Sequence, residues 1–312
     1  MISRFSREWS VAIALGVLLL LMAIVAPAFF EPQPLLSRLA REAPTLVVAC
    51  GMALVIICRQ IDISVGSQFA VCSVSAGMLA AAGWPVPALL AVSIGVGALL
   101  GAINGVLVAG LRLPSIVVTL ATLAIWREGL RWVQQGQFVT LPDNLQWLGL
   151  SQGAGQLMLI ACATLLVVLL AQGMKHLAAG RYLYAIGSDA EAARLAGLRP
   201  HLMTFLVFVL LGALTGLAAM MNVIQSPQVD PKSGTGLELK TIAAVVVGGV
   251  AISGGRGRLW GVLIGLLLLA TINPALTYLR IEAYWERAIQ GAIILLAVIA
   301  DGVRTRREPT SK

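Results

Sequence analysis

Long runs of hydrophobic residues, separated by short polar breaks, dominate the chain from end to end. Most runs are about 18–22 residues long, the length of α-helix that crosses the roughly 30 Å hydrocarbon core of a bilayer. The pattern predicts about ten membrane-spanning helices and leaves any number from about eight to ten open. The predicted spans are 9–30, 43–60, 63–83, 86–110, 114–133, 156–174, 202–223, 238–254, 259–279 and 286–302.

Two places in this pattern allow more than one interpretation. The polar break Arg59-Gln60-Ile61-Asp62 interrupts an otherwise apolar block, which allows a broken or re-entrant span. Such backbone survives at membrane depth only where protein surrounds it. The first run is followed by Ala26-Pro27-Ala28, which resembles a signal-peptidase site. Because many further apolar runs follow, we expect an uncleaved first helix.

The composition supports a membrane protein. Of the 312 residues, 59% are hydrophobic and 12% are charged, whereas a soluble domain carries about 25% charged residues. We therefore expect an all-α bundle of membrane helices, surrounded by membrane lipid, with residues 1–312 forming one transmembrane domain. The net charge of +8 does not indicate a nucleic-acid partner, because no basic patch alternates with exposed aromatic residues.

The distribution of basic residues predicts the orientation. With ten spans and an inner N-terminus, most of the 22 Lys and Arg residues fall on inner segments. Two of these segments are the loop 175–201 and the basic tail 303–312. Because cytoplasmic loops carry the excess of positive charge, both termini are predicted to be cytoplasmic.

Stripes of glycine predict close contacts between helices. Small residues four positions apart lie on one helix face and let two backbones approach, so that dispersion contacts hold helices together in lipid. The stripes are Gly97, Gly101 and Gly105; Gly212 and Gly216; and Gly257, Gly261 and Gly265.

The sequence lacks the motifs of an enzyme. The glycine-rich stretch 254–258 has no Lys-Ser/Thr pair and does not match a phosphate-binding loop. The only two histidines are His176 and His201, and no acidic cluster accompanies them. A metal site, a serine–histidine nucleophile and a membrane-embedded enzyme are therefore disfavoured, and no cofactor is expected on this chain.

The inner loop 175–201 contains a predicted short helix. Ser188 is expected to cap it, with Asp189 and Glu191 in the first turn, where the positive end of the helix dipole stabilises acidic side chains. Gly197 is expected just after its last residue, and Pro200 prevents its continuation. The helix is either an ordinary surface helix or one that docks into a groove of a soluble partner.

A few polar side chains fall within or between apolar runs. Asp62, Ser64 and Ser67 are predicted to cap the next helix or to bond between helices, with direct solute contact as the alternative. The same two interpretations apply to asparagines near the interiors or ends of spans, which could hydrogen-bond an uncharged polyol or a neighbouring helix. They are Asn104, Asn222 and Asn273.

Several motifs, in the same order along the chain, resemble those of one family. They are Ile61-Asp62-Ile63-Ser64-Val65-Gly66-Ser67, the loop from Tyr184 to Gly197, the stretch from Gly236 to Gly249, Gly254-Gly255-Arg256-Gly257, and the segment from Gly291 to Asp301. Together they resemble the permease subunits of bacterial sugar ABC importers, which include ribose, xylose, rhamnose and autoinducer-2 permeases. The resemblance covers roughly residues 10–303.

This resemblance implies an inner-membrane protein with the fold of the vitamin B12-type importer class. It implies a cytoplasmic ABC ATPase subunit that binds ATP, a periplasmic solute-binding protein, and a second permease, either a copy or a paralogue. The short inner helix would be the coupling helix, with Gly187, Asp189, Glu191, Ala192, Ala193 and Gly197 coupling to the ATPase. The residues expected to line a translocation path are Asp62, Ser64, Asn104 and Asn222.

The expected function is therefore import of a sugar or sugar-like solute by a subunit that is not itself an enzyme. Three stretches resemble the autoinducer-2 and rhamnose branches most: Arg59–Asp62, Gly234–Glu238 and Leu279–Trp285. Many relatives carry Gly-Gly or Thr-Gly where Arg59-Gln60 stands, and the solute remains open. The alternative is an autonomous secondary carrier or channel, for which the sequence shows no convincing repeat and no obvious ion relay.

Overall fold

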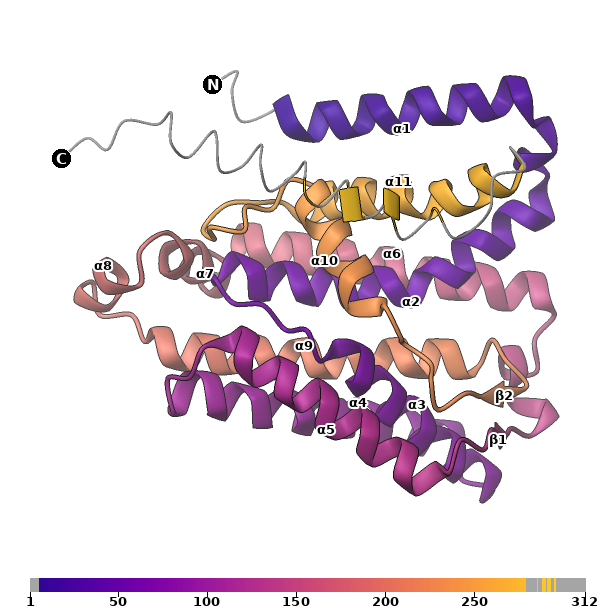
Figure 1. The fold of residues 1–312 in the computed structure, drawn as a ribbon, viewed down its shortest axis with the longest axis horizontal. Coiled ribbons are helices and arrows are strands. Elements are labelled where there is room, and N and C mark those ends of the chain that lie inside the picture. The colour runs from indigo at the N-terminus through magenta and orange to yellow at the C-terminus, as the bar shows by residue number, and fades with distance from the viewer. Residues whose placement is uncertain (1–5, 279–284, 286–287, 290, 293–294, 296–312) are drawn as a thin grey trace.

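A computed structural model describes residues 6–278 and, beyond them, residues 285, 288–289, 291–292 and 295. The predicted basic tail 303–312 lies outside the described residues, and so does most of the predicted span 286–302. The described chain is almost entirely helical, as expected (Figure 1). A single pair of two-residue strands, Val139–Thr140 (β1) and Gln228–Val229 (β2), forms an antiparallel ladder within this part.

Most helices lie side by side along one common direction (Figure 1). The α-helices are α1 (Ser6–Val25), α2 (Pro32–Ile57), α3 (Val65–Ala81), α4 (Val86–Gly105), α5 (Ser115–Gln134), α6 (Gln152–His176), α7 (Ala178–Ser188), α8 (Ala190–Leu195), α9 (Pro200–Val223), α10 (Leu237–Val247) and α11 (Leu259–Tyr278). Three short elements connect them: η1 (Pro27–Phe30), the π-helical turn η2 (Val106–Gly110) and η3 (Asp143–Gly149).

Five helical stretches among the described residues are long and apolar enough to cross a membrane. They are α2, α4 continued by η2, α6, α9 and α11. Helix α2 begins at Pro32, well before the expected start at residue 43. Proline is tolerated in the first turn of a helix, where its missing N–H has no partner to lose, so the polar stretch before residue 43 is helical.

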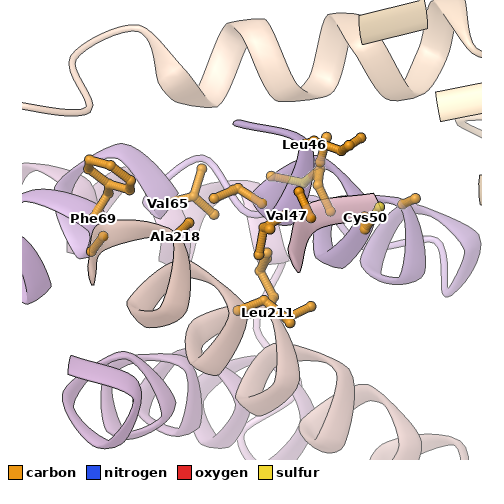
Figure 2. Close-up of a cluster of buried hydrophobic side chains, with 14 of the residues drawn as sticks. Leu46, Val47, Cys50, Val65, Phe69, Leu211 and Ala218 are labelled. Atoms are coloured by element: carbon orange, nitrogen blue, oxygen red, sulfur yellow. The ribbon is translucent and has the colours of Figure 1, made fainter. Parts of the chain in front are cut away.

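Helix α2 is the centre of the bundle. Every residue from Ala43 to Cys58 is buried, so this helix is apolar on all faces and surrounded by protein. Figure 2 shows how α2, α3 and α9 contribute to one packed cluster. Its labelled members are Leu46, Val47, Cys50, Val65, Phe69, Leu211 and Ala218.

Helices α4 and α9 pack backbone against backbone through their glycine stripes. A Cβ atom at Gly97 would overlap the carbonyl oxygen of Gly212, and the reverse is equally true. One turn along, a Cβ atom at Gly101 would overlap the carbonyl oxygen of Phe208. The close helix contact predicted from the glycine spacing is therefore present between these two helices.

Two of the predicted spans are broken. Helix α3 is preceded by the non-helical segment 58–64, and α10 by 230–236, and both helices begin partway along the length of the bundle (Figure 1). Helix α10 has 11 residues, which is about 16 Å of helix and too short to cross the hydrocarbon core. It ends at Val247 because Gly248 packs on the carbonyl of Gly261 and Gly249 turns with φ 93°.

We predict that Gly97→Ala lowers the free energy of unfolding by about 2 kcal/mol or more, because the added methyl group forces α4 and α9 apart. Thermal unfolding in detergent measures the change. Gly95→Ala is the matched control on the same helix, since a Cβ atom there meets nothing within 4 Å. Equal stability of the two variants would contradict the proposed role of the glycine contact.

Candidate transport and coupling sites

The non-helical segment before α3 is held by a buried hydrogen-bond network around Asp62. The Oδ1 atom of Asp62 accepts hydrogen bonds from the backbone N–H (2.8 Å) and the hydroxyl of Ser64. Its Oδ2 atom accepts from Nε2 of Gln68 on α3 (3.0 Å) and from Nδ2 of Asn104 on α4 (3.2 Å). The network thus joins the segment to two helices.

The members of this network are fully buried. Asp62, Ser64, Gln68 and Asn104 each expose 0% of their surface. The two amides also donate to the hydroxyl oxygen of Ser64, at 2.9 Å from Gln68 and 2.8 Å from Asn104. Both oxygens of the Asp62 carboxyl group thus have donors within the protein, two at each oxygen.

Three of the four residues expected on a translocation path therefore lie together, namely Asp62, Ser64 and Asn104. The fourth, Asn222, lies half-buried near the end of α9, and no side-chain hydrogen bond joins it to the other three in the described structure. Ser64 stands at the start of α3 and makes no side-chain capping bond. The hydrogen bonds observed for Ser64 and Asp62 instead hold the segment and connect it to α4.

The two broken spans meet next to this network. A Cβ atom at Gly66, in the first turn of α3, would overlap the carbonyl oxygen of Gly234 and the carboxylate of Glu238 at the start of α10. Gly234 has φ 73°, a left-handed conformation that favours glycine. The backbone N–H of Gly236 donates to Oε1 of Glu238 (3.2 Å). Only glycine at position 66 leaves room for this approach.

The predicted coupling loop contains two helices, α7 and α8. Asp189 lies between them and caps α8, since its Oδ1 atom accepts from the N–H groups of Glu191 (2.9 Å) and Ala192 (3.0 Å). The expectation that Ser188 caps this helix was wrong, because Ser188 is the last residue of α7. The predicted end is confirmed: Gly197 follows α8 with φ 86°.

The two charged side chains of helix α8 neutralise each other. Glu191 and Arg194 form an exposed ion pair within the helix. The hydrogen bond from Arg194, together with its positive charge, lowers the pKa of Glu191 below its usual range. The pair is therefore intact above the ordinary glutamate pKa and is lost as the pH falls through the lowered value. Ala193 packs inward and Leu195 is 78% exposed.

Helix α7 docks directly on the end of α2. A Cβ atom at Gly187 would overlap the carbonyl oxygen of Ile57, and that same oxygen accepts a hydrogen bond from the N–H of Gly255 (2.9 Å). The Tyr184 hydroxyl donates to the carbonyl of Gly257 (2.8 Å). The coupling loop, the end of α2 and the glycine-rich stretch 254–257 therefore form one packed unit.

Sequence reasoning did not foresee α7 or this three-way contact. The sequence signals for this contact were two separate glycine motifs, one at Gly187 and one at Gly254-Gly255. Nothing in the sequence pairs the one motif with the other or with Ile57, since such a contact depends on the tertiary fold.

Comparison with known proteins identifies the class. Residues 35–298 match the family described as "Branched-chain amino acid transport system / permease component". The chain belongs to this family of transport components, and the expected relationship to permease subunits of sugar-type ABC importers is confirmed. With its apolar helices, it is a multi-pass membrane protein.

Two relatives illustrate the relationship. The chain is 34% identical to the "Autoinducer 2 import system permease protein LsrC" of Enterobacter sp. (strain 638), over 95% of this chain and 87% of the relative. It is 33% identical to the "Ribose import permease protein RbsC" of Escherichia coli (strain K12), over 95% of each chain. No solved structure matches this chain at a significant level. The expected vitamin B12-type fold stays a prediction.

We predict that Asp62→Ala and Asn104→Ala each lower the free energy of unfolding by about 2–4 kcal/mol, because each leaves buried polar partners unsatisfied. Since the two side chains share one network, the double variant should lose less than the sum of the two single variants, by about 1 kcal/mol or more. Unfolding in detergent measures all three variants.

Thr271→Ala provides the control for this cycle. Its hydroxyl donates to the carbonyl of Leu267 in the same helix (2.7 Å) and to no other described residue. The loss of stability from Thr271→Ala should therefore add to that from Asp62→Ala. Strict additivity in the Asp62–Asn104 pair would show that the two residues act independently.

Proposed function

We propose that this chain is the permease subunit of an ATP-driven ABC importer in the bacterial inner membrane, carrying a sugar or sugar-like solute. A separate ABC ATPase subunit binds and hydrolyses ATP, and a periplasmic binding protein delivers the solute. The pore is formed with a second permease, either a copy of this chain or a paralogue. Family membership supports the class, and the names of the relatives favour autoinducer-2 or ribose-like solutes.

The observation that carries this proposal is the construction of the coupling loop. Helix α8 protrudes at one end of the bundle, where a soluble partner can reach it (Figure 1). The adjoining helix α7 contacts Ile57 and Gly255 without an intervening side chain. A displacement of α7–α8 by the ATPase is therefore transmitted to the end of α2 and to the segment that carries Asp62. The residues that we propose to couple this movement to the ATPase are Gly187, Asp189, Glu191, Ala192, Ala193 and Gly197.

The orientation follows from the same proposal. The end that carries α8 faces the cytoplasm. This agrees with the positive-inside distribution of Lys and Arg, from which we expect both termini on the same side. The end with β1 and β2 faces the periplasm and receives the binding protein.

We further propose that Asp62, Ser64, Asn104 and Asn222 lie on or beside the solute path. The first three are inaccessible in the described conformation. The segment 58–64 must move for the solute to meet them, whereas Asn222 is partly exposed near the end of α9. A neutral polyol suits amide and hydroxyl partners, which offer hydrogen bonds in place of ion pairs.

Co-purification tests the proposed function. A tag on this chain should retain an ABC ATPase subunit, whose ATP hydrolysis in liposomes rises when the periplasmic binding protein and its solute are present. A protein that purifies alone and moves sugar into liposomes without ATP would contradict the proposal and favour an autonomous carrier.

We predict that Gly187→Ala separates ATP hydrolysis from transport. The methyl group displaces α7 from the Ile57 carbonyl, so solute uptake should fall roughly tenfold while the ATPase remains bound and active. Uptake of labelled solute and phosphate release, measured on the same proteoliposomes, give the ratio of transport to hydrolysis.

Gly173→Ala in α6 is the matched control for Gly187→Ala. A Cβ atom there comes no closer than 3.6 Å to a neighbouring atom, the end of the Leu177 side chain. Its ratio of transport to hydrolysis should equal that of the unmodified protein. An unchanged ratio in Gly187→Ala as well would exclude the coupling role of the glycine contact.

A further inference from the structure

A cavity of about 380 Å³ lies beside the coupling loop. Its walls come from four places in the chain: the end of α2, the turn after η2, the junction of α7 with α8, and the start of α9. Ile186 and Ala190 bring the α7–α8 junction to its wall. A partner that contacts α8 therefore also reaches this cavity.

The charge of the cavity is positive and unneutralised. Arg59, Arg112 and His201 line it, and none of its lining residues is an aspartate or a glutamate. Within the described part of the chain, the side chains of these three residues form no ion pair and no hydrogen bond. Unpaired guanidinium groups around a concave site favour an anion, most of all a planar carboxylate or a phosphate.

Arg59 and Arg112 both adopt a backbone conformation that is unfavourable for arginine. Arg59 has φ 63° and Arg112 has φ 58°, a left-handed conformation in which glycine is favoured. Arg59 stands directly after the last turn of α2, where its N–H donates to Ile56 (2.9 Å) and that of Gln60 to Val55 (3.0 Å). Glycine is the usual residue at this position. Because two arginines that line one cavity both adopt this unfavourable conformation, we expect their side chains to have a functional role there.

The start of α9 adds to the preference for an anion. Helix α9 begins at Pro200, and Arg199 before it makes no side-chain capping bond. The first N–H groups of this long helix, near His201, therefore remain free of a side-chain cap and carry the positive end of the helix dipole.

We infer that this cavity receives an acidic side chain of the ATPase subunit that docks on α8. The inference rests on the proposed function, which puts the ATPase at this end of the bundle. Helix α8 offers the exposed Leu195 and a self-neutralised Glu191–Arg194 pair, so it supplies apolar contact but no net charge. The cavity supplies the complementary charge, which fixes the register of docking.

The test compares the complex of the unmodified chain with that of the double variant Arg59→Gly/Arg112→Gly. Glycine fits both left-handed positions, so the backbone is kept while the charges are removed. Affinity for the ATPase subunit should fall roughly tenfold or more, and the remaining affinity should depend less on sodium chloride concentration. Lys175→Gln removes an exposed cation outside the cavity lining and should leave the affinity unchanged.

A second variant identifies the partner group directly. Arg112→Lys places an amine at the cavity, and a carbodiimide should join it to an aspartate or glutamate of the ATPase. Mass spectrometry of the cross-linked peptide should name that residue, and the unmodified chain should lack the cross-link.

The possible failures are distinguishable. If no ATPase purifies with the unmodified chain, the proposed function fails and this inference fails with it. If the ATPase binds the unmodified chain and the double glycine variant equally, with the same salt dependence, only the acidic docking is wrong. If the double variant keeps the ATPase but loses co-purified phosphatidylglycerol, the cavity is a lipid site, which also overturns the inference.

Discussion

The structure depends on one constraint, which is that lipid cannot hydrogen-bond an exposed peptide group. Non-helical backbone inside the bundle must therefore find all of its partners within the protein. The Asp62 network supplies such a partner to the backbone of the segment 58–64, and Ile57 and Tyr184 supply partners to the stretch 254–257. Helix α2 joins the two irregular stretches, since the segment 58–64 follows its last residue and the carbonyl of Ile57 accepts from the N–H of Gly255.

The buried network and the coupling contact share the same short piece of chain. Ile57, which Gly187 contacts, ends α2, and the segment that follows it leads directly to Asp62. The coupling contact is backbone on backbone, and the network holds the segment through hydrogen bonds among fully buried side chains. A shift at one end of the segment must therefore be accommodated at the other.

Much of the fold could be predicted from the sequence, because apolar length and glycine spacing are local properties. They indicated the long spans and the glycine faces of α4 and α9, whereas the pairing of Gly97 with Gly212 came only from the structure. The end of α8 at Gly197 also followed from local chemistry. The early start of α2, the short α10 and the unforeseen α7 depend on tertiary packing. The meeting of Gly66 with Glu238, and of Gly187 with Ile57, joins residues far apart in the chain, and no local pattern encodes such a pair.

The shortness of α10 has a consequence for how the protein is made. A helix of 11 residues with non-helical chain on both sides is too short to partition into a bilayer as an independent unit. Its neighbour α2 must already stand in the membrane to receive it, since Lys240 needs Glu42 of α2 as a counter-ion (2.6 Å). The other neighbour, α11, follows α10 in the chain and packs on it afterwards. Biogenesis of this chain therefore cannot proceed by stepwise insertion of autonomous helices followed by association. Here the late chain enters a site that earlier-synthesised helices have prepared.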